Sequence, residues 1–337
     1  MPQWTINIPG RTILRAAFEL TYRYAIFSAH AYCPKDNRLN GENAMLNEVC
    51  DTQFCQDSKD IKVLKVYNGE ITYLILEDST TKQIILSFKG TSSPKEWAID
   101  TNYRLTTYNP SAISDRLATR KFDCNSCKVH RGFLQGYSIF HKESLQELLK
   151  VMEERGDYKL YVVGHSLGGA IAQIAAIEFY LCGLDPIIIN YGSPKVMDYR
   201  LSDWMTDHFP PDKAIAFLRR GEVKPNSYFR VTTSRDIVPM LPPYEQGFSH
   251  SGYQLNIYSS EPPVLENDLE LAGSFDRFTE LSKWKERLSL LKKNYKKYIK
   301  NPMSGYKEFV QIKYHRYYYL RMGCSYAHVK SVEAEEG

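Results

Sequence analysis

The segment that most restricts how this chain can fold is YKLYVVGHSLGGAI, residues 158–171, where an apolar run meets Gly-His-Ser-Leu-Gly and then small residues. The apolar run at Leu160–Val163 predicts a buried strand, and the pattern over Leu167–Leu181 predicts a helix. Ser166 therefore stands where a strand must turn sharply into a helix. One interpretation is a tight turn that needs small residues, and the other is an elbow that exposes a nucleophilic serine at a sheet edge. The strand before it and the helix after it favour the elbow.

The composition describes an ordinary soluble globular protein. The chain has 337 residues, of which 43% are hydrophobic and 24% charged, and this length suits one large α/β unit. The net charge of +4 is too small to indicate a nucleic-acid partner. No apolar run is long enough to predict a transmembrane segment. The N-terminal residues carry regularly spaced arginines, so they lack the apolar core of a secretory signal and predict a first helix from about Thr12 to Ala31.

Apolar, β-branched segments alternate with helical patterns along the chain. This alternation predicts an α/β fold with a mostly parallel sheet and helices on both faces. The turn at Asn68-Gly69 adds an antiparallel part. With no repeat or low-complexity linker, residues 1–337 are expected to form a single domain. Strands are expected at Lys62–Tyr67, Ile71–Glu77, Gln83–Phe88, Leu160–Val163, Pro186–Tyr191, Tyr228–Thr232 and Tyr253–Tyr258, and further helices at Leu134–Glu154 and Asp198–Thr206.

The segment 274–300 differs from the rest because it contains nine Lys or Arg against three Asp or Glu. Its apolar residues recur every three or four positions, which predicts an amphipathic helix with a basic face. Such a helix either docks on the protein with its basic side in solvent or attracts anionic lipid surfaces. The first interpretation is favoured.

A serine nucleophile requires a base to take its proton and an acid to orient that base. For an elbow serine the expected order along the chain is Ser, then Asp or Glu, then His. Asp236 follows a predicted strand, as the acid should, and three histidines come after it. His250 leads into a strand and His328 lies in a polar tail, whereas His315 precedes an aromatic run that could hold it against the core. The pattern favours Ser166, Asp236 and His315.

The seven cysteines bear on the cellular compartment in which the protein is found. Two close pairs, Cys50/Cys55 and Cys124/Cys127, lie in polar, turn-rich sequence. Zinc is one interpretation of such pairs, but the wider spacing of the first pair favours small-loop disulfides. Disulfides indicate an oxidising compartment, whereas the N-terminus shows no secretory signal.

Taken together, the motifs resemble those of the class 3 lipases, the fungal triacylglycerol lipase family with an α/β-hydrolase fold. The resemblance covers nearly the whole chain in family order. It rests on FSAHAYC (27–33), IILSFKGTSSPKEW (84–97), CNSCKVHRGF (124–133), VVGHSLGGA (162–170), NYGSPKV (190–196), RDIVPMLPP (235–243), FSHSGY (248–253) and YHRYYYLRMGC (314–324).

The resemblance implies a role for each site residue. The catalytic triad falls on Ser166, Asp236 and His315, and His250 matches a family histidine with no catalytic role. The oxyanion hole falls on Thr91, through its N–H and hydroxyl, and on the N–H of Leu167. The segment 92–102 matches a short lid helix over the site, with Ser93, Pro94, Trp97 and Ile99 among its residues.

The resemblance also pairs the cysteines. It implies the disulfides Cys33–Cys324, Cys50–Cys55 and Cys124–Cys127 and leaves Cys182 as a core thiol. The interval between Asp236 and His315 is longer than the family's, and the basic segment 274–300 accounts for the excess.

The expected activity is a serine carboxylic ester hydrolase, a lipase that cleaves acylglycerols through an acyl-enzyme without a metal or an organic cofactor. Alternatives on the same fold are a soluble-substrate esterase similar to feruloyl esterases, or a phospholipase. A third alternative is a non-catalytic lipid- or membrane-binding relative. The expected partner is an ester lipid substrate, and peripheral contact with lipid surfaces is an alternative for the segment 274–300. Neither a nucleic-acid partner nor a membrane span is expected. The cysteines favour the secretory pathway or the extracellular space, and the N-terminus favours the cell interior.

Overall fold

The structure is a computed structural model. It describes residues 13–36, 39, 41–50, 55–56, 58–91, 104–234, 236–259, 264–274 and 312–324. The predicted lid, 92–102, lies outside the described residues, and so does the predicted basic helix beyond its first residue, Ser274. Ser274 itself ends a strand and pairs antiparallel with Tyr253, so a helix in this segment could begin only after it.

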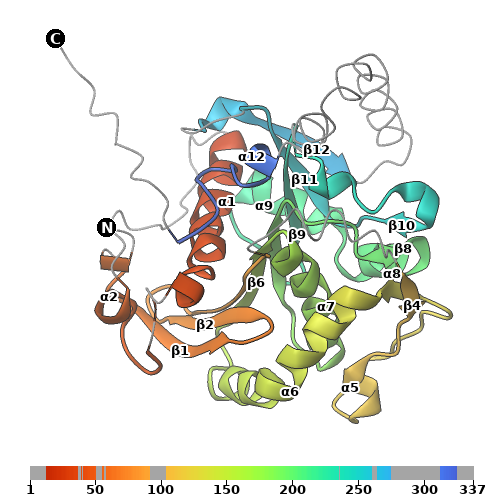
Figure 1. Ribbon diagram of the computed structural model, residues 1–337, viewed down its shortest axis with the longest axis horizontal. Coiled ribbons are helices and arrows are strands. Elements are labelled where there is room, and N and C mark those ends of the chain that lie inside the picture. The colour runs from red at the N-terminus through yellow and green to blue at the C-terminus, as the bar shows by residue number, and fades with distance from the viewer. Residues whose placement is uncertain are drawn as a thin grey trace, which may run out of the picture.

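The centre of the described fold is an eight-stranded sheet in the order β1-β2-β3-β6-β7-β9-β11-β12 (Figure 1). From β3 to β11 neighbouring strands run parallel, whereas β1, β2 and β12 are antiparallel to their neighbours. This arrangement confirms the predicted α/β fold with a mostly parallel sheet. The strands are β1 Ile61–Asn68, β2 Thr72–Asp78, β3 Gln83–Phe88, β6 Lys159–His165, β7 Ile187–Tyr191, β9 Tyr228–Thr233, β11 Tyr253–Ile257 and β12 Leu269–Ser274.

Helices cover both faces of this sheet. The inner strands are apolar and β-branched along their whole length, so both of their faces must be buried. The longest pair, α6 (Arg131–Glu154) and α7 (Leu167–Leu181), packs together on one face with α5 and α8. The opposite face is covered by α1 (Ile13–His30) and α9 (Pro211–Arg220). The other helices are α2 Leu46–Val49, α5 Ser111–Ser114, α8 Tyr199–His208 and α12 Ile312–His315.

A small second sheet, in the order β10-β8-β5-β4, was not expected from the sequence. Its strands are only two or three residues long, too short to produce a periodic pattern. They are β4 Leu105–Thr107, β5 Lys128–His130, β8 Met197–Asp198 and β10 Phe248–Ser249. Among the helices that the structure describes, none has both the length and the apolar character that crossing a bilayer requires.

The C-terminal segment that begins with α12 lies beside α1, so the two ends of the described chain meet (Figure 1). The hydroxyl groups of Tyr319 and Thr21 are 2.5 Å apart, and the disulfide Cys33–Cys324 joins residues that are 291 positions apart. These contacts hold the segment that carries His315 against the sheet.

Candidate active site

Ser166 occupies the sharp turn between β6 and α7. Its φ of 58° and ψ of −127° are strained for a residue with a side chain. Two glycines make room for this turn. A Cβ at Gly168 would lie 2.1 Å from the carbonyl oxygen of Phe88, and one at Gly164 would lie 2.4 Å from the carbonyl carbon of Gly168. Only glycine therefore lets strand, turn and helix approach so closely, which explains the sequence pattern around the serine.

The candidate residues converge because the parallel strands end at one edge of the sheet. Ser166 directly follows β6, Thr91 comes three residues after β3, and Asp236 comes three residues after β9. His315 reaches the same edge from α12, since its ring contacts Asp236. Thus residues spread over more than 220 positions of sequence meet at one place.

Asp236 and His315 form a buried hydrogen-bonded pair. His315 Nδ1 lies 2.8 Å from Asp236 Oδ2, and both side chains are fully buried. The Tyr318 hydroxyl donates to the same carboxylate oxygen at 2.6 Å, while Oδ1 accepts from the N–H of Val238 at 2.9 Å. Three donors therefore hold the carboxylate, and because Nδ1 must carry a proton to bind it, Nε2 is the basic atom of the neutral ring.

Two polar atoms at this site are buried without a hydrogen-bond partner in the described part of the chain: His315 Nε2 and Thr91 Oγ1. Buried polar groups are ordinarily paired, so an unpaired base and an unpaired hydroxyl indicate a place kept for reacting groups. Gly90 brings Thr91 close to the elbow, since a Cβ at position 90 would lie 3.0 Å from Ser166 Cβ. Within the described residues, Ser166 and His315 form no hydrogen bond with each other.

His165 contacts His315 directly, which was not predicted from the sequence. Its Nε2 donates to the main-chain oxygen of His315 at 2.7 Å, and the Tyr32 hydroxyl lies 2.8 Å from its Nδ1. The His165 and His315 rings are 4.6 Å apart between centroids. Burial lowers the pKa of His165 well below its ordinary value, so the ring stays neutral. His165 and Tyr32 both occur in the quoted motifs GHSLG and FSAHAYC, but the motifs alone do not show that these two residues meet.

The loop after Asp236 is held by two buried polar side chains. Lys195 Nζ donates to the carbonyl oxygens of Met240 at 2.7 Å and of Pro242 at 3.2 Å. His250 Nε2 donates to the Pro239 oxygen at 2.6 Å, and burial lowers the pKa of His250 well below its usual range. His250 thus supports the loop that follows Asp236.

The structure contains the disulfides Cys33–Cys324, Cys50–Cys55 and Cys124–Cys127. Cys182 is a half-buried thiol whose pKa burial raises to about 11, so it is an inert residue rather than a nucleophile. Leu167 lies at the start of α7, where its N–H has no intrahelical acceptor. Among the described residues, the one group of side chains with metal-ligand spacing is His30, Cys50 and Cys55, and it includes none of Ser166, Asp236 and His315.

Comparison with known proteins identifies lipases among the relatives of this chain. A family model described as Lipase (class 3) matches residues 85–246. A lipase of Rhizomucor miehei is 27% identical over 263 residues, covering 75% of this chain and 62% of the relative. Lipase A of Sodiomyces alcalophilus is 34% identical over 206 residues, covering 58% of this chain and 48% of the relative. The chain thus spans between about half and two thirds of the length of these two relatives.

A solved triacylglycerol lipase, whose catalytic centre is a triad of the serine-protease kind, superimposes with a TM-score of 0.64. The superposition covers 92% of this chain and 97% of that chain at 24% identity. This likeness concerns the fold and agrees with the sheet and helix layers described above.

Proposed function

This chain belongs to the class 3 lipase family, and from that premise we propose that it is a serine carboxylic ester hydrolase that cleaves acylglycerols. The observation that carries the proposal is the buried Asp236–His315 pair, whose unpaired Nε2 lies at the same sheet edge as Ser166. A carboxylate-bound imidazole beside a strained serine is the arrangement that acyl transfer requires.

In the proposed mechanism, Ser166 Oγ attacks the ester carbonyl while His315 Nε2 takes its proton. Asp236 holds the ring and stabilises the imidazolium that forms. The same nitrogen then protonates the leaving alcohol, and an acyl-enzyme remains on the serine. A water molecule attacks this ester with His315 again as base, which releases the fatty acid and restores Ser166.

The negative charge that develops on the carbonyl oxygen needs donors fixed in advance. We assign this role to Thr91, through its N–H and hydroxyl, and to the N–H of Leu167. Two facts support the assignment: Thr91 Oγ1 is buried with no partner among the described residues, and Leu167 is the first residue of α7. The partial positive charge of the helix N-terminus acts in the same direction.

The decisive variant is Ser166→Ala. It should remove at least about three orders of magnitude in kcat on a p-nitrophenyl ester, because nucleophile and base act as a unit. The matched control is Ser138→Ala on α6, which removes a half-buried hydroxyl bonded to a helix carbonyl and should leave kcat nearly unchanged. Substantial turnover by a folded Ser166→Ala protein would refute the assignment of the nucleophile.

The substrate class is tested separately. Hydrolysis of a short-chain triglyceride should rise sharply when its concentration passes the solubility limit, as expected of an enzyme that works on lipid surfaces. A smooth saturation curve with no increase at that point would favour a soluble-substrate esterase. Preference for a phospholipid over an acylglycerol would instead favour a phospholipase.

We further propose that this protein acts in an oxidising compartment and makes peripheral contact with lipid surfaces. Three disulfides support the compartment, because such bonds persist outside the reducing cytosol. The basic, amphipathic sequence of 274–300 supports the contact. Co-sedimentation of Ser166→Ala protein with anionic vesicles at low and high salt tests it. Equal binding to neutral vesicles, or no binding at low salt, would count against the proposal.

A further inference from the structure

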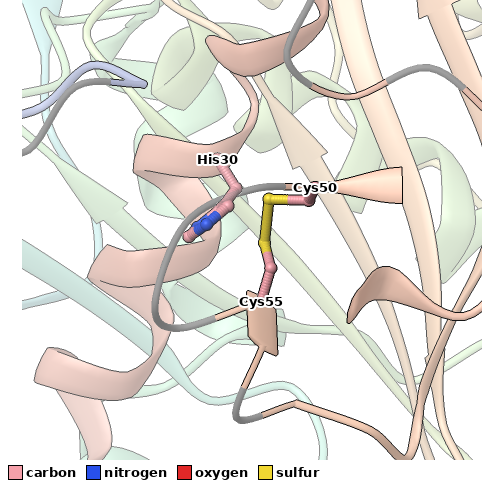
Figure 2. A group of neighbouring side chains, drawn as sticks. All are labelled: His30, Cys50 and Cys55. Carbon is pink, nitrogen blue, oxygen red and sulfur yellow. A yellow bond between two sulfur atoms is a disulfide. The ribbon is translucent and has the colours of Figure 1, made fainter. Parts of the chain in front are cut away.

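A histidine and a disulfide face each other at the C-terminal end of α1. Figure 2 shows the ring of His30 beside the bond between Cys50 and Cys55. The ligand atoms of the three side chains all lie within 4.8 Å of one another. All three residues are buried, with relative exposures of 0%, 4% and 0%. A nitrogen and two sulfurs are therefore gathered in an environment that excludes solvent.

The orientation of His30 is the one found in metal-binding histidines. Its Nδ1 lies 2.7 Å from the main-chain oxygen of Ile26, and since a carbonyl can only accept, Nδ1 carries the proton. The lone pair of the neutral ring is therefore on Nε2. A backbone carbonyl in this position commonly fixes the tautomer of a metal ligand.

While the Cys50–Cys55 bond is intact, its sulfurs are not thiolates and do not bind metal strongly. We propose that reduction of this disulfide creates a zinc site formed by the thiolates of Cys50 and Cys55 and the Nε2 atom of His30. A dithiol reductant supplies two electrons and two protons, its own sulfurs form a disulfide, and the Cys50–Cys55 bond breaks to give two thiols. Each thiol then releases its proton to solvent as Zn²⁺ binds.

The spacing fits this metal. With zinc–sulfur bonds near 2.3 Å and zinc–nitrogen bonds near 2.0 Å, ligand atoms of a tetrahedral site lie about 3.5–3.8 Å apart. Because the ligand atoms already lie within 4.8 Å of one another, the nitrogen needs to approach the sulfurs by no more than about 1 Å. The Cα atoms of the cysteines are 5.7 Å apart, so rotation about the Cα–Cβ bonds can separate the two sulfurs.

The chemistry of the donors also selects zinc. Thiolate and imidazole suit zinc, whereas calcium and magnesium prefer oxygen. Three protein ligands leave one tetrahedral position for water or another donor. The loop between Cys50 and Cys55 would thus be closed by a disulfide under oxidising conditions and by zinc under reducing conditions. This site does not depend on the proposed ester hydrolysis.

The experiment compares oxidised and reduced full-length protein after incubation with zinc sulfate and removal of unbound metal. The reduced protein should retain about one zinc per chain, and the oxidised protein almost none. His30→Asn should weaken zinc binding at least about tenfold, a loss typical of a disturbed site. Cys50→Ser with Cys55→Ser should abolish it. The matched control, Cys124→Ser with Cys127→Ser, removes the other short-loop pair and should retain the zinc.

Cobalt gives a second, spectroscopic readout that unspecific binding would not reproduce. Reduced protein with Co²⁺ should show the visible ligand-field bands of a tetrahedral thiolate site, and His30→Asn should shift or remove them. Thermal unfolding of the reduced protein should move to higher temperature with one equivalent of zinc. Equal zinc retention by wild type and His30→Asn, or a reduced chain that neither binds zinc nor gains stability from it, would overturn the proposal.

Discussion

The ring of His165, the residue just before the elbow serine, donates a hydrogen bond from Nε2 to the main-chain oxygen of His315, 2.7 Å away. The end of β6 and the C-terminal segment are thereby joined at His315, the proposed base, and at the residue next to Ser166, the proposed nucleophile. Tyr32 fixes the tautomer of His165 from the other side at 2.8 Å. The segment just after α1, which carries Tyr32, is tied covalently to the C-terminal segment by Cys33–Cys324. We therefore expect His165 to position His315, the proposed base.

Replacing His165 with Phe keeps a ring of similar size but removes the donor to His315. The carbonyl oxygen of His315 would then be buried without this bond, which costs about 1–3 kcal/mol in the free energy of unfolding. We expect kcat on a p-nitrophenyl ester to fall about tenfold or more while KM changes little, since His165 orients the base rather than the substrate. Tyr32→Phe is the milder comparison, because it removes one hydroxyl and leaves the His165–His315 bond. Unchanged kcat in His165→Phe would contradict the positioning role.

Tyr318→Phe tests whether activity and stability depend on the hydrogen bond from Tyr318 to Asp236. The Tyr318 hydroxyl donates to Asp236 Oδ2, the same oxygen that His315 contacts. A hydrogen bond to a charged group contributes about 1.5–3 kcal/mol, so chemical unfolding should show a loss of this size. We expect a several-fold decrease in kcat, because the carboxylate keeps its bonds to Val238 and His315. Tyr317→Phe, at the neighbouring half-buried position, is the control. A Tyr318→Phe enzyme with full activity would show that the other donors suffice.

Gly90→Ala tests the close approach between Thr91 and the elbow. A Cβ at position 90 would lie 2.3 Å from the Tyr32 hydroxyl oxygen and 2.6 Å from the main-chain oxygen of His165, so the backbone must shift. This shift would displace the Thr91 donors, and the loss of one such donor costs about 10²–10³ in kcat. Gly156→Ala is the matched control, because its nearest atom would be 3.9 Å away. Equal kcat values for the two variants would argue against Thr91 as an oxyanion donor.

The elements with a strong local pattern could be predicted from the sequence. The helix Leu167–Leu181 and the strand Gln83–Phe88 have the expected bounds, because each is long or apolar enough for its pattern of apolar residues to be recognised in the sequence. The family resemblance is confirmed by the comparisons. The roles of Ser166, Asp236 and His315 remain proposals, although the structure brings the last two into contact.

What could not be predicted depends on tertiary contacts. The strand Leu269–Ser274 forms by pairing with β11, and its residues carry little β pattern of their own. The bond between His165 and His315 joins residues 150 positions apart, so no local pattern reveals it. The helix expected from Leu134 begins at Arg131 instead, because the side chain of His130 caps it.

That cap makes His130 a source of acid sensitivity. His130 Nδ1 accepts the N–H of Gly132 at 3.2 Å, and the ring stacks on Phe133 with centroids 4.0 Å apart. Burial lowers the pKa of His130 from its ordinary value near 6.5 to about 4. Well above pH 6.5 the ring is neutral in both the folded and the unfolded chain, so it has no effect on the pH dependence. As the pH falls from 6.5 towards 4, the unfolded chain takes up a proton that the folded chain does not, and stability is lost.

At pH 5 this difference amounts to about 2 kcal/mol for one such histidine. A proton on Nδ1 would also abolish the cap and place a positive charge at the N-terminus of α6, where the helix dipole disfavours it. Asn caps helices well and does not titrate. His130→Asn should therefore unfold at nearly the wild-type temperature at pH 7.5 but at a clearly higher temperature than wild type at pH 5. Thermal unfolding at several pH values measures both curves. Because His165 and His250 are also buried with lowered pKa values, a residual slope is expected in the variant, and parallel curves would contradict the role of His130.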